Sequence, residues 1–176
     1  MNTSQNGPEP AGENTVNSFI MVDGASAMID FLTDVFGATE TFEARSPDMF
    51  AADGSLIHAE VRIGSSLIML ADRKADWPFT PALTQVYVDD AEQTLRRAVA
   101  RGSTVVTEVS PFYGGYDIAR FQDPWHNLWW LFSPAADAAA SSQEWDEATW
   151  EVPSEPDAVY TTLLEAMHNL KDPAAG

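Results

Sequence analysis

The sequence IHAEVRIGSSLIMLAD, residues 57–72, carries the hairpin signal on which the fold depends. Apolar and polar residues alternate over 55–63, which predicts a strand because successive side chains of a strand point to opposite faces. A second apolar run covers 66–72, and the Gly64-Ser65 pair between the runs favours a two-residue turn. Two neighbouring antiparallel strands are therefore expected.

A strand and a helix are expected before this hairpin. Residues 15–22 have strand character, and Asp23 is then predicted to cap a helix. The helix is expected to end at Gly37 and to be followed by a strand over 39–45. Its apolar positions follow helical spacing and are Ala25, Met28, Ile29, Leu32 and Phe36.

The same order of elements is expected a second time. A strand is predicted over 82–88, then a helix capped by Asp90 and ended by Gly102, with Ala91, Leu95, Ala98 and Val99 on its apolar face. Strands near 103–109, 116–122 and 127–133 follow. Gly37 and Gly102 are 65 residues apart, which favours a duplication, although chance similarity between short segments is an alternative. The predicted class is α+β, with two βαβββ modules over 15–73 and 82–133.

Composition limits the function. The formal net charge is −18, from 27 acidic and 9 basic residues, so nucleic acid and membrane surfaces are not expected partners. No apolar run has the length of a membrane span and the N-terminus lacks a signal core, so a cytoplasmic protein is expected. There is no cysteine, which leaves His58, His126 and His168 as the imidazoles for metal or base chemistry.

The ends of the chain lie outside the two modules. Residues 1–14 are expected to be a disordered tail and residues 134–152 a linker, because both are polar or small and lack apolar periodicity. A C-terminal helix is predicted over 153–172, starting at the capping signal Ser154-Glu155-Pro156-Asp157. Its apolar stripe, Val159, Leu163, Met167 and Leu170, either covers the chain's own domain or clasps a partner subunit.

Three segments resemble a known family. They are VDGASAMIDFLTDVFGA (22–38), IHAEVRIGSSLIMLAD (57–72) and FQDPWHNLWWLF (121–132). They are similar to the vicinal oxygen chelate superfamily, which includes glyoxalase I, extradiol dioxygenases and bleomycin-resistance proteins, and most of all to its PhnB-like branch. The resemblance covers roughly residues 15–133 and implies a cup-shaped sheet surface, often in a homodimer. It implies little about function, because the superfamily mixes enzymes and binders.

The resemblance also allows the metal positions to be checked. Metal-dependent members carry four His, Glu or Gln ligands on the first and last strands of each module. The matching positions here are Asn17, Met69, Leu83 and Trp130. Methionine, leucine and tryptophan do not hold a divalent cation through oxygen or imidazole. No metal and no cofactor are therefore expected.

Strand alternation predicts which side chains line the cup. Ile57, Ala59, Val61 and Ile63 are expected to face the helix and Leu56, His58, Glu60 and Arg62 the cup. Glu60 and Arg120 lie on equivalent strands and are expected to pair across it or to fill the interior. The predicted ligand-binding residues are Asn17, Phe19, His58, Glu60, Met69, Gln85, Tyr87, Tyr113, Tyr116, Arg120 and Trp130.

Two turns, at residues 125–127 and within 110–118, bear on the predicted binding site. The family often has Phe-Gly-His where this chain has Trp125-His126-Asn127, so His126 is expected to be a turn residue with positive φ rather than a ligand or base. The segment SPFYGGYDI (110–118) is either a mobile lid over the cup or an ordinary glycine turn between strands.

Three functions follow as hypotheses. The leading one is a metal-free protein that binds or sequesters a hydrophobic or aromatic small molecule, because small-molecule pockets combine apolar walls with few polar groups. The second is a metal-dependent lyase, isomerase or dioxygenase with a relocated site around His58 and Glu60. The third is a dimeric interaction protein whose cup is filled by its own side chains. Whether the chain is an enzyme is left open.

Overall fold

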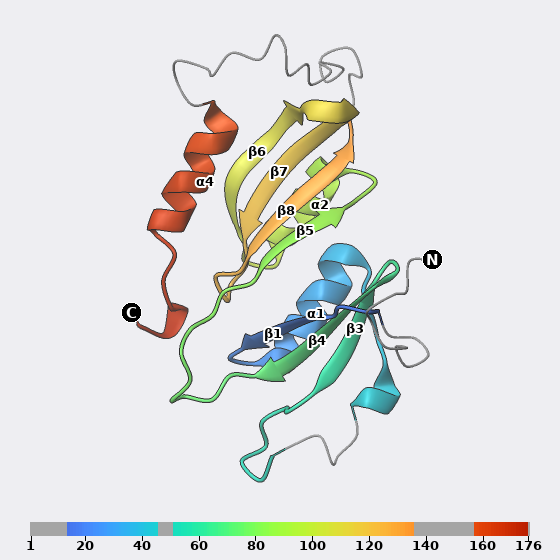
Figure 1. The fold of residues 1–176 in the computed structure, drawn as a ribbon, viewed down its shortest axis with the longest axis vertical. Coiled ribbons are helices and arrows are strands. Elements are labelled where there is room, and N and C mark those ends of the chain that lie inside the picture. The colour runs from blue at the N-terminus through green and yellow to red at the C-terminus, as the bar shows by residue number, and fades with distance from the viewer. Residues whose placement is uncertain (1–13, 46–50, 136–156, 176) are drawn as a thin grey trace, which may run out of the picture. The chain divides into compact units, whose positions relative to one another are not determined.

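The structure, a computed structural model, describes residues 14–45, 51–135 and 157–175. The predicted tail over 1–14 therefore lies outside the described residues except for Asn14, and so does the predicted linker beyond residue 135. The chain divides into two compact units, residues 1–78 and 79–176. Each unit contains one of the predicted modules (Figure 1).

The first unit has the expected order of one strand, one helix and three strands. The chain forms β1 (Ser18–Val22), α1 (Ala25–Phe36), β2 (Thr39–Glu40), the short helix η1 (Phe42–Ala44), β3 (Ala59–Ile63) and β4 (Ser66–Asp72). The sheet order is β1-β4-β3-β2. β1 runs parallel to β4, while β3 is antiparallel to both β4 and β2. Ile63 pairs with Ser66, so the predicted two-residue turn is confirmed.

The second unit repeats this topology. It contains β5 (Leu83–Tyr87), α2 (Ala91–Ala100), β6 (Thr104–Phe112), η3 (Tyr113–Gly115), β7 (Tyr116–Gln122), β8 (Leu128–Pro134), α4 (Ala158–His168) and η4 (Pro173–Ala175). The sheet order β5-β8-β7-β6 matches that of the first unit. β5 is parallel to β8, and the other pairs are antiparallel. The α+β class and the two βαβββ modules are confirmed.

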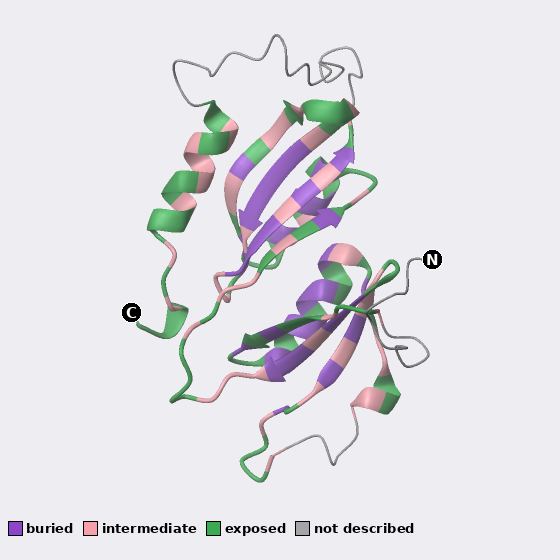
Figure 2. Ribbon diagram, viewed as in Figure 1, coloured by how far each residue is buried: buried purple, intermediate pink, exposed green. Residues whose placement is uncertain are grey.

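One face of each sheet is packed against its helix. In the first unit, Ile20, Val61 and Leu70 lie in the core with the buried side of α1. In the second unit, the rings of Phe121 and Trp129 stack 6.3 Å apart in the core. The alternation along β8 is visible as buried and less buried bands (Figure 2), whereas β7 is buried continuously from Ile118 to Phe121.

The alternation predicted for 55–63 holds only from residue 59. Ala59 and Val61 are buried as expected, but Ile57 is 45% exposed and Leu56 is buried. The reason is that β3 begins at Ala59, whereas the Leu56 carbonyl accepts from the Asp72 backbone N–H and the Leu56 N–H donates to the Asp72 carboxylate. The predicted strand over 39–45 was likewise too long, because the chain turns into η1 after Glu40.

The helices α1 and α2 start in different ways. Asp90 caps α2 as predicted, accepting from the backbone N–H of Gln93 at 2.8 Å. The prediction that Asp23 caps α1 was wrong: the N-cap residue is Gly24, with φ of 88°, and it supplies no side chain. Asp72 instead accepts from the N–H groups of Gly24 and Ala25. Val99, expected on the buried face of α2, is 47% exposed.

The C-terminal helix packs against the second sheet of its own chain. α4 starts at Ala158 after the N-cap Asp157, so it is shorter than predicted, and residues 153–156 lie outside the described residues. It lies along β6 (Figure 1), where the hydroxyls of Thr107 and Thr162 are 2.7 Å apart. No residue of α4 is buried, so its apolar stripe is only partly covered. No helix of the described ranges is long and apolar enough to cross a membrane.

The turn between β7 and β8 is built around a buried carboxylate. Asp123 accepts from the N–H groups of Trp125 and Asn127, from the Asn127 amide and from the Trp129 indole, at 2.8 to 2.9 Å. His126 has φ of 64°, and of the non-glycine residues in the described part of the chain only this one has a positive φ. The prediction of a turn residue at His126 is confirmed.

Candidate ligand-binding faces

Each sheet has a second face, opposite to the face that packs on α1 or α2, which we call its open face. In the first sheet Phe19, Met69 and Glu60 are side by side across β1, β4 and β3, because Phe19 and Glu60 both pair with Met69. In the second sheet Gln85, Trp130 and Arg120 occupy the same kind of row across β5, β8 and β7. Six of the predicted ligand-binding residues therefore form two equivalent rows.

His58 joins the open face of the first sheet. Its Nε2 lies 3.3 Å from Oε1 of Glu60, and its ring is 6.1 Å from that of Phe19. Both the His58 and Glu60 side chains are mostly covered. The sequence-predicted residues Phe19, His58, Glu60 and Met69 are thus brought together into one patch with an imidazole and a carboxylate in contact.

Asn17 has a local structural role. It precedes β1, and its side chain exchanges hydrogen bonds with the backbone of Asn14: Nδ2 donates to the Asn14 carbonyl at 3.1 Å, and Oδ1 accepts from the Asn14 N–H at 3.2 Å. Phe19, not Asn17, is the register partner of Met69. The Asn17 amide oxygen is therefore already engaged by the backbone.

The open face of the second sheet carries an aromatic cluster, which we define as Tyr87, Phe112, Tyr113, Tyr116 and Phe132. Ring centres of Tyr87 and Phe112 lie 5.8 and 5.7 Å from that of Phe132, and Tyr87 is 5.8 Å from Tyr116. Tyr113 reaches the cluster through Phe112, at 5.2 Å. Tyr87 is nevertheless 67% exposed. The cluster is a preformed surface of tilted and edge-on rings that is open to solvent.

The segment proposed as a lid forms the end of a hairpin. Phe112 ends β6, Tyr116 begins β7, and the two residues are register partners. Tyr113, Gly114 and Gly115 make the short helix η3, in which both glycines have positive φ. Of the two predicted alternatives, a lid or a glycine turn, the structure has the glycine turn between β6 and β7. Through this turn Tyr113 and Tyr116 contact the other rings of the aromatic cluster.

Arg120 is a buried cation beside this cluster. It is only 6% exposed, and its Nη1 donates to the Val159 carbonyl of α4 at 2.6 Å and to Thr107 Oγ1 at 3.2 Å. Its guanidinium carbon lies 5.6 Å from the centre of the Trp130 ring. Burial lowers the pKa of Arg120, while the negative charge of Asp157 opposes that shift. Within its own unit, Glu60 contacts His58, and Arg120 donates to Thr107 and Val159.

The residues at the family's metal positions do not fit a metal ion. Met69, Leu83 and Trp130 offer no oxygen or imidazole donor, and the amide oxygen of Asn17 accepts a backbone hydrogen bond. Within 14–45, 51–135 and 157–175, no three His, Asp or Glu side chains are grouped so that they could hold a metal ion. No catalytic step through a metal can be derived from this set of side chains.

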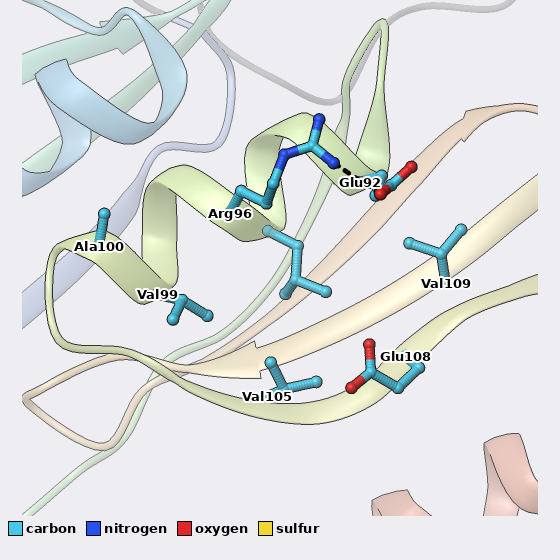
Figure 3. Close-up of a pocket in the computed structure, with 8 residues that line it drawn as sticks. Glu92, Arg96, Val99, Ala100, Val105, Glu108 and Val109 are labelled. Atoms are coloured by element: carbon cyan, nitrogen blue, oxygen red, sulfur yellow. Dashed lines mark hydrogen bonds and ion pairs between the residues drawn. The ribbon is translucent and has the colours of Figure 1, made fainter.

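The helix side of the second sheet carries a feature that the sequence did not predict. A groove of about 680 Å³ lies between α2 and β6, lined by Leu95, Val99, Ala100, Val105 and Val109 (Figure 3). Its charged rim includes Glu92 and Arg96, which form an ion pair at 2.6 Å. Val99 lines this groove and is 47% exposed, although the helical spacing predicted that it would be buried. An apolar residue at the edge of the buried face of α2 was therefore the sequence signal for the groove.

Comparisons with known proteins agree with this geometry. The family model described as the Glyoxalase/Bleomycin resistance protein/Dioxygenase superfamily matches residues 14–131. An uncharacterized protein of Mycobacterium bovis is 31% identical over 149 residues, covering 74% of this chain and 95% of the relative. An uncharacterized protein of Mycobacterium tuberculosis shows the same identity over 74% of this chain and 85% of its own length.

Solved structures share the fold at low sequence identity. A glyoxalase/bleomycin resistance protein/dioxygenase family enzyme from Burkholderia phytofirmans superimposes with a TM-score of 0.55 at 21% identity, covering 68% of this chain and 97% of that one. A mutant fosfomycin resistance protein from Listeria monocytogenes, complexed with Mn(II) and 1S,2S-dihydroxypropylphosphonic acid, gives 0.53 at 16% identity, over 70% and 94%. TioX from Micromonospora gives 0.51 at 18% identity, over 68% and 99%.

The repeated βαβββ topology and the family match over 14–131 lead to the same assignment: this chain belongs to the glyoxalase/bleomycin resistance protein/dioxygenase superfamily.

Proposed function

We propose that the protein binds a hydrophobic or aromatic small molecule on the open face of its second sheet, without a metal ion. The observation that carries the proposal is the aromatic cluster of Tyr87, Phe112, Tyr113, Tyr116 and Phe132, whose rings contact one another and remain partly open to solvent. Aromatic faces and edges attract a planar ligand by about 0.5 to 1.5 kcal/mol beyond simple burial. A cluster held in place by its own contacts also costs little entropy to use.

Metal independence is supported by the residue types at the family's ligand positions. Three of these, Met69, Leu83 and Trp130, lack a suitable donor, and a single amide at Asn17 does not make a site. The fosfomycin resistance protein from Listeria monocytogenes is complexed with Mn(II), so this fold is compatible with a bound metal. The side chains in this chain favour binding by shape and stacking instead.

A fluorescent apolar probe provides the test. N-phenyl-1-naphthylamine is aromatic, uncharged and bright only in apolar surroundings, so a titration measures its Kd directly. Tyr87→Ala is expected to weaken binding about tenfold or more, because Tyr87 contacts two rings of the cluster and is 67% exposed. Phe42→Ala is the matched control, since Phe42 is 74% exposed in the other unit. Equal Kd values for wild type and both variants would contradict the proposal.

Metal analysis completes this test. We expect the protein purified without chelator to hold less than one-tenth of an equivalent of zinc, manganese, iron or nickel, and its affinity for the probe to be unchanged by a chelator. A stoichiometric metal that is lost together with probe binding would refute metal independence. Failure of every apolar probe to bind would favour the third hypothesis, an interaction protein whose open faces are filled by their own side chains.

The contact between His58 and Glu60 supports a second candidate function, a metal-dependent lyase, isomerase or dioxygenase. The imidazole and the carboxylate are 3.3 Å apart and mostly covered, which suits proton transfer or two of the ligands of an ion. His58→Ala distinguishes the candidates: it abolishes metal binding and turnover if the site is used, and changes neither if His58 only packs against Phe19.

Three finer assignments complete the proposal. We place the protein in the PhnB-like branch of the superfamily, in the cytoplasm and as a homodimer. The branch rests on the segments FQDPWHNLWWLF and IHAEVRIGSSLIMLAD. The homodimer is tested by light scattering coupled to size exclusion: a mass near twice 19.2 kDa is expected, and a mass near one chain contradicts it.

A further inference from the structure

Two buried N–H donors on the open face of the second sheet have no hydrogen-bond acceptor among the described residues. They are Nε of Arg120 and Nε1 of Trp130, both without a partner in the described part of the chain. A buried donor that has lost water and gained no partner costs about 1 to 3 kcal/mol, and more when it is charged. Two such groups next to each other therefore point to an acceptor that the described residues do not supply.

The two donors belong to one row of the sheet. Arg120 on β7 and Trp130 on β8 are register partners, and Trp130 is in turn the partner of Gln85 on β5. The Arg120 guanidinium carbon is 5.6 Å from the centre of the Trp130 ring. An acceptor placed between them meets a guanidinium, an indole N–H and, one strand further, a neutral amide that is exposed.

Within 14–45, 51–135 and 157–175, no carboxylate forms an ion pair with Arg120. Its two hydrogen-bonded partners, the Thr107 hydroxyl and the Val159 carbonyl, are both neutral. The acidic group whose charge reaches it is Asp157, and that carboxylate accepts from the N–H of Tyr160 at the start of α4. A buried cation without a paired anion is costly, so an incoming oxyanion gains both a hydrogen bond and a charge.

The aromatic cluster begins one step along the same strands. Phe132 and Tyr87 follow Trp130 and Gln85 by two residues on β8 and β5 and are register partners of each other. Two residues of a strand span about 7 Å. A fused aromatic ring system with an attached acidic group is at least this long from end to end, so one ligand can contact both regions.

We propose that the ligand is an aromatic oxyanion, a compound in which a planar ring system carries a carboxylate, sulfonate or phosphonate group. The rings lie on the aromatic cluster, and the oxyanion accepts from Arg120 Nε and Trp130 Nε1. This inference rests on the proposed function and adds the chemical class of the ligand. Entry of the acid group requires a displacement of α4, which contacts Arg120 through one carbonyl and has no buried residue.

A matched pair of probes separates this inference from the proposed function. 8-Anilinonaphthalene-1-sulfonate and N-phenyl-1-naphthylamine share one ring framework and differ by the sulfonate. The wild type is expected to bind the sulfonate about tenfold more tightly or better. The net charge of −18 repels anions in general, so a preference for the anion requires a specific site.

The decisive variant is Trp130→Phe, which removes the N–H and keeps an aromatic ring. Because Nε1 has no protein acceptor among the described residues, this change costs the fold little. It is expected to reduce the preference for the sulfonate to threefold or less, because it weakens binding of the sulfonate more than binding of the neutral probe. Arg120→Met should do the same, and thermal unfolding of each variant verifies that it is folded.

The outcomes are distinct. Equal affinity of the wild type for both probes overturns the oxyanion inference and leaves the proposed function standing, whereas failure of both probes to bind overturns the two together. A preference that survives in Trp130→Phe and Arg120→Met also overturns the inference. Val99→Glu in the groove between α2 and β6 should change neither Kd; loss of both there would place the probes in the groove and contradict the proposed site.

Discussion

The carboxylate of Asp72 at the end of β4 accepts a hydrogen bond of 2.6 Å from the backbone N–H of Ala25, the first residue of α1. The same carboxylate accepts from Gly24 N at 3.1 Å and from Leu56 N at 2.6 Å. One side chain thus joins the start of the helix, the last strand and the segment before β3. We expect Asp72→Ala to lower the free energy of unfolding by about 3 kcal/mol, because three backbone donors lose a charged acceptor.

Asp90→Ala is the comparison for this variant. Asp90 also caps a helix, but its side chain accepts one backbone hydrogen bond, from Gln93. Its loss should cost about 1 kcal/mol. Chemical denaturation of both variants gives the two values, and an Asp72→Ala protein no less stable than Asp90→Ala would show that the three contacts of Asp72 do not act together.

The contrast between these two caps shows how far the sequence predicts the fold. Asp90 is three residues before the N–H that it caps, and local spacing identified it. Asp72 is 47 residues after Ala25, so a capping rule that examines neighbouring residues selects Asp23 instead. The turn at Gly64-Ser65 was found for the same reason as Asp90. Elements defined by local spacing were predicted well, whereas ends defined by distant contacts, such as the start of β3, were not.

The buried carboxylate of Asp123 organises the turn between β7 and β8. It is 2% exposed and accepts four hydrogen bonds from Trp125, Asn127 and Trp129. Asp123→Ala is expected to destabilise the protein by about 4 kcal/mol, because the buried donors of Asn127 and Trp129 lose their acceptor. Thermal unfolding measures the loss; a change in Tm of only one or two degrees would show that water replaces the carboxylate.

The same carboxyl predicts a pH dependence. Burial raises the pKa of Asp123 above its ordinary value of 3.8, although the hydrogen bonds from Trp129 and Asn127 oppose the shift. The folded protein therefore holds this proton to a higher pH than the unfolded chain. Its contribution to stability is largest below 3.8 and is lost as the pH rises through the folded pKa. The stability difference between wild type and Asp123→Asn should shrink over that window, and a difference that grows contradicts the direction of the shift.

The left-handed conformation of His126 predicts a sequence preference. Its φ is 64°, a region that β-branched residues rarely adopt. His126→Val should therefore cost about 1 to 2 kcal/mol. His126→Gly should be close to neutral, since glycine relieves the backbone but removes the 2.7 Å hydrogen bond between Nδ1 and the Lys171 carbonyl. Equal stability of the two variants, measured by denaturation, would show that the backbone conformation is not what selects the residue.

The candidate site was predicted in part for the same local reason. Strand alternation placed His58 and Glu60 on one face, and the structure has them 3.3 Å apart. It also placed Arg120 and Trp130 among the site residues, on equivalent faces of neighbouring strands. The sequence did not predict that Arg120 would donate to Val159 of α4, because the docking position of a separate helix depends on surface contacts that have no fixed spacing.

The hydroxyls of Thr107 on β6 and Thr162 on α4 are 2.7 Å apart. The energy of this hydrogen bond measures how strongly α4 is held against β6. Thr107→Val and Thr162→Val each keep the shape of the side chain and remove the contact, so a double-mutant cycle isolates its energy. We expect a coupling of about 1 kcal/mol. Because Thr107 also accepts from Arg120, Thr107→Val should be the more destabilising single variant. A coupling near zero would mean that α4 is held at β6 by contacts other than this hydrogen bond.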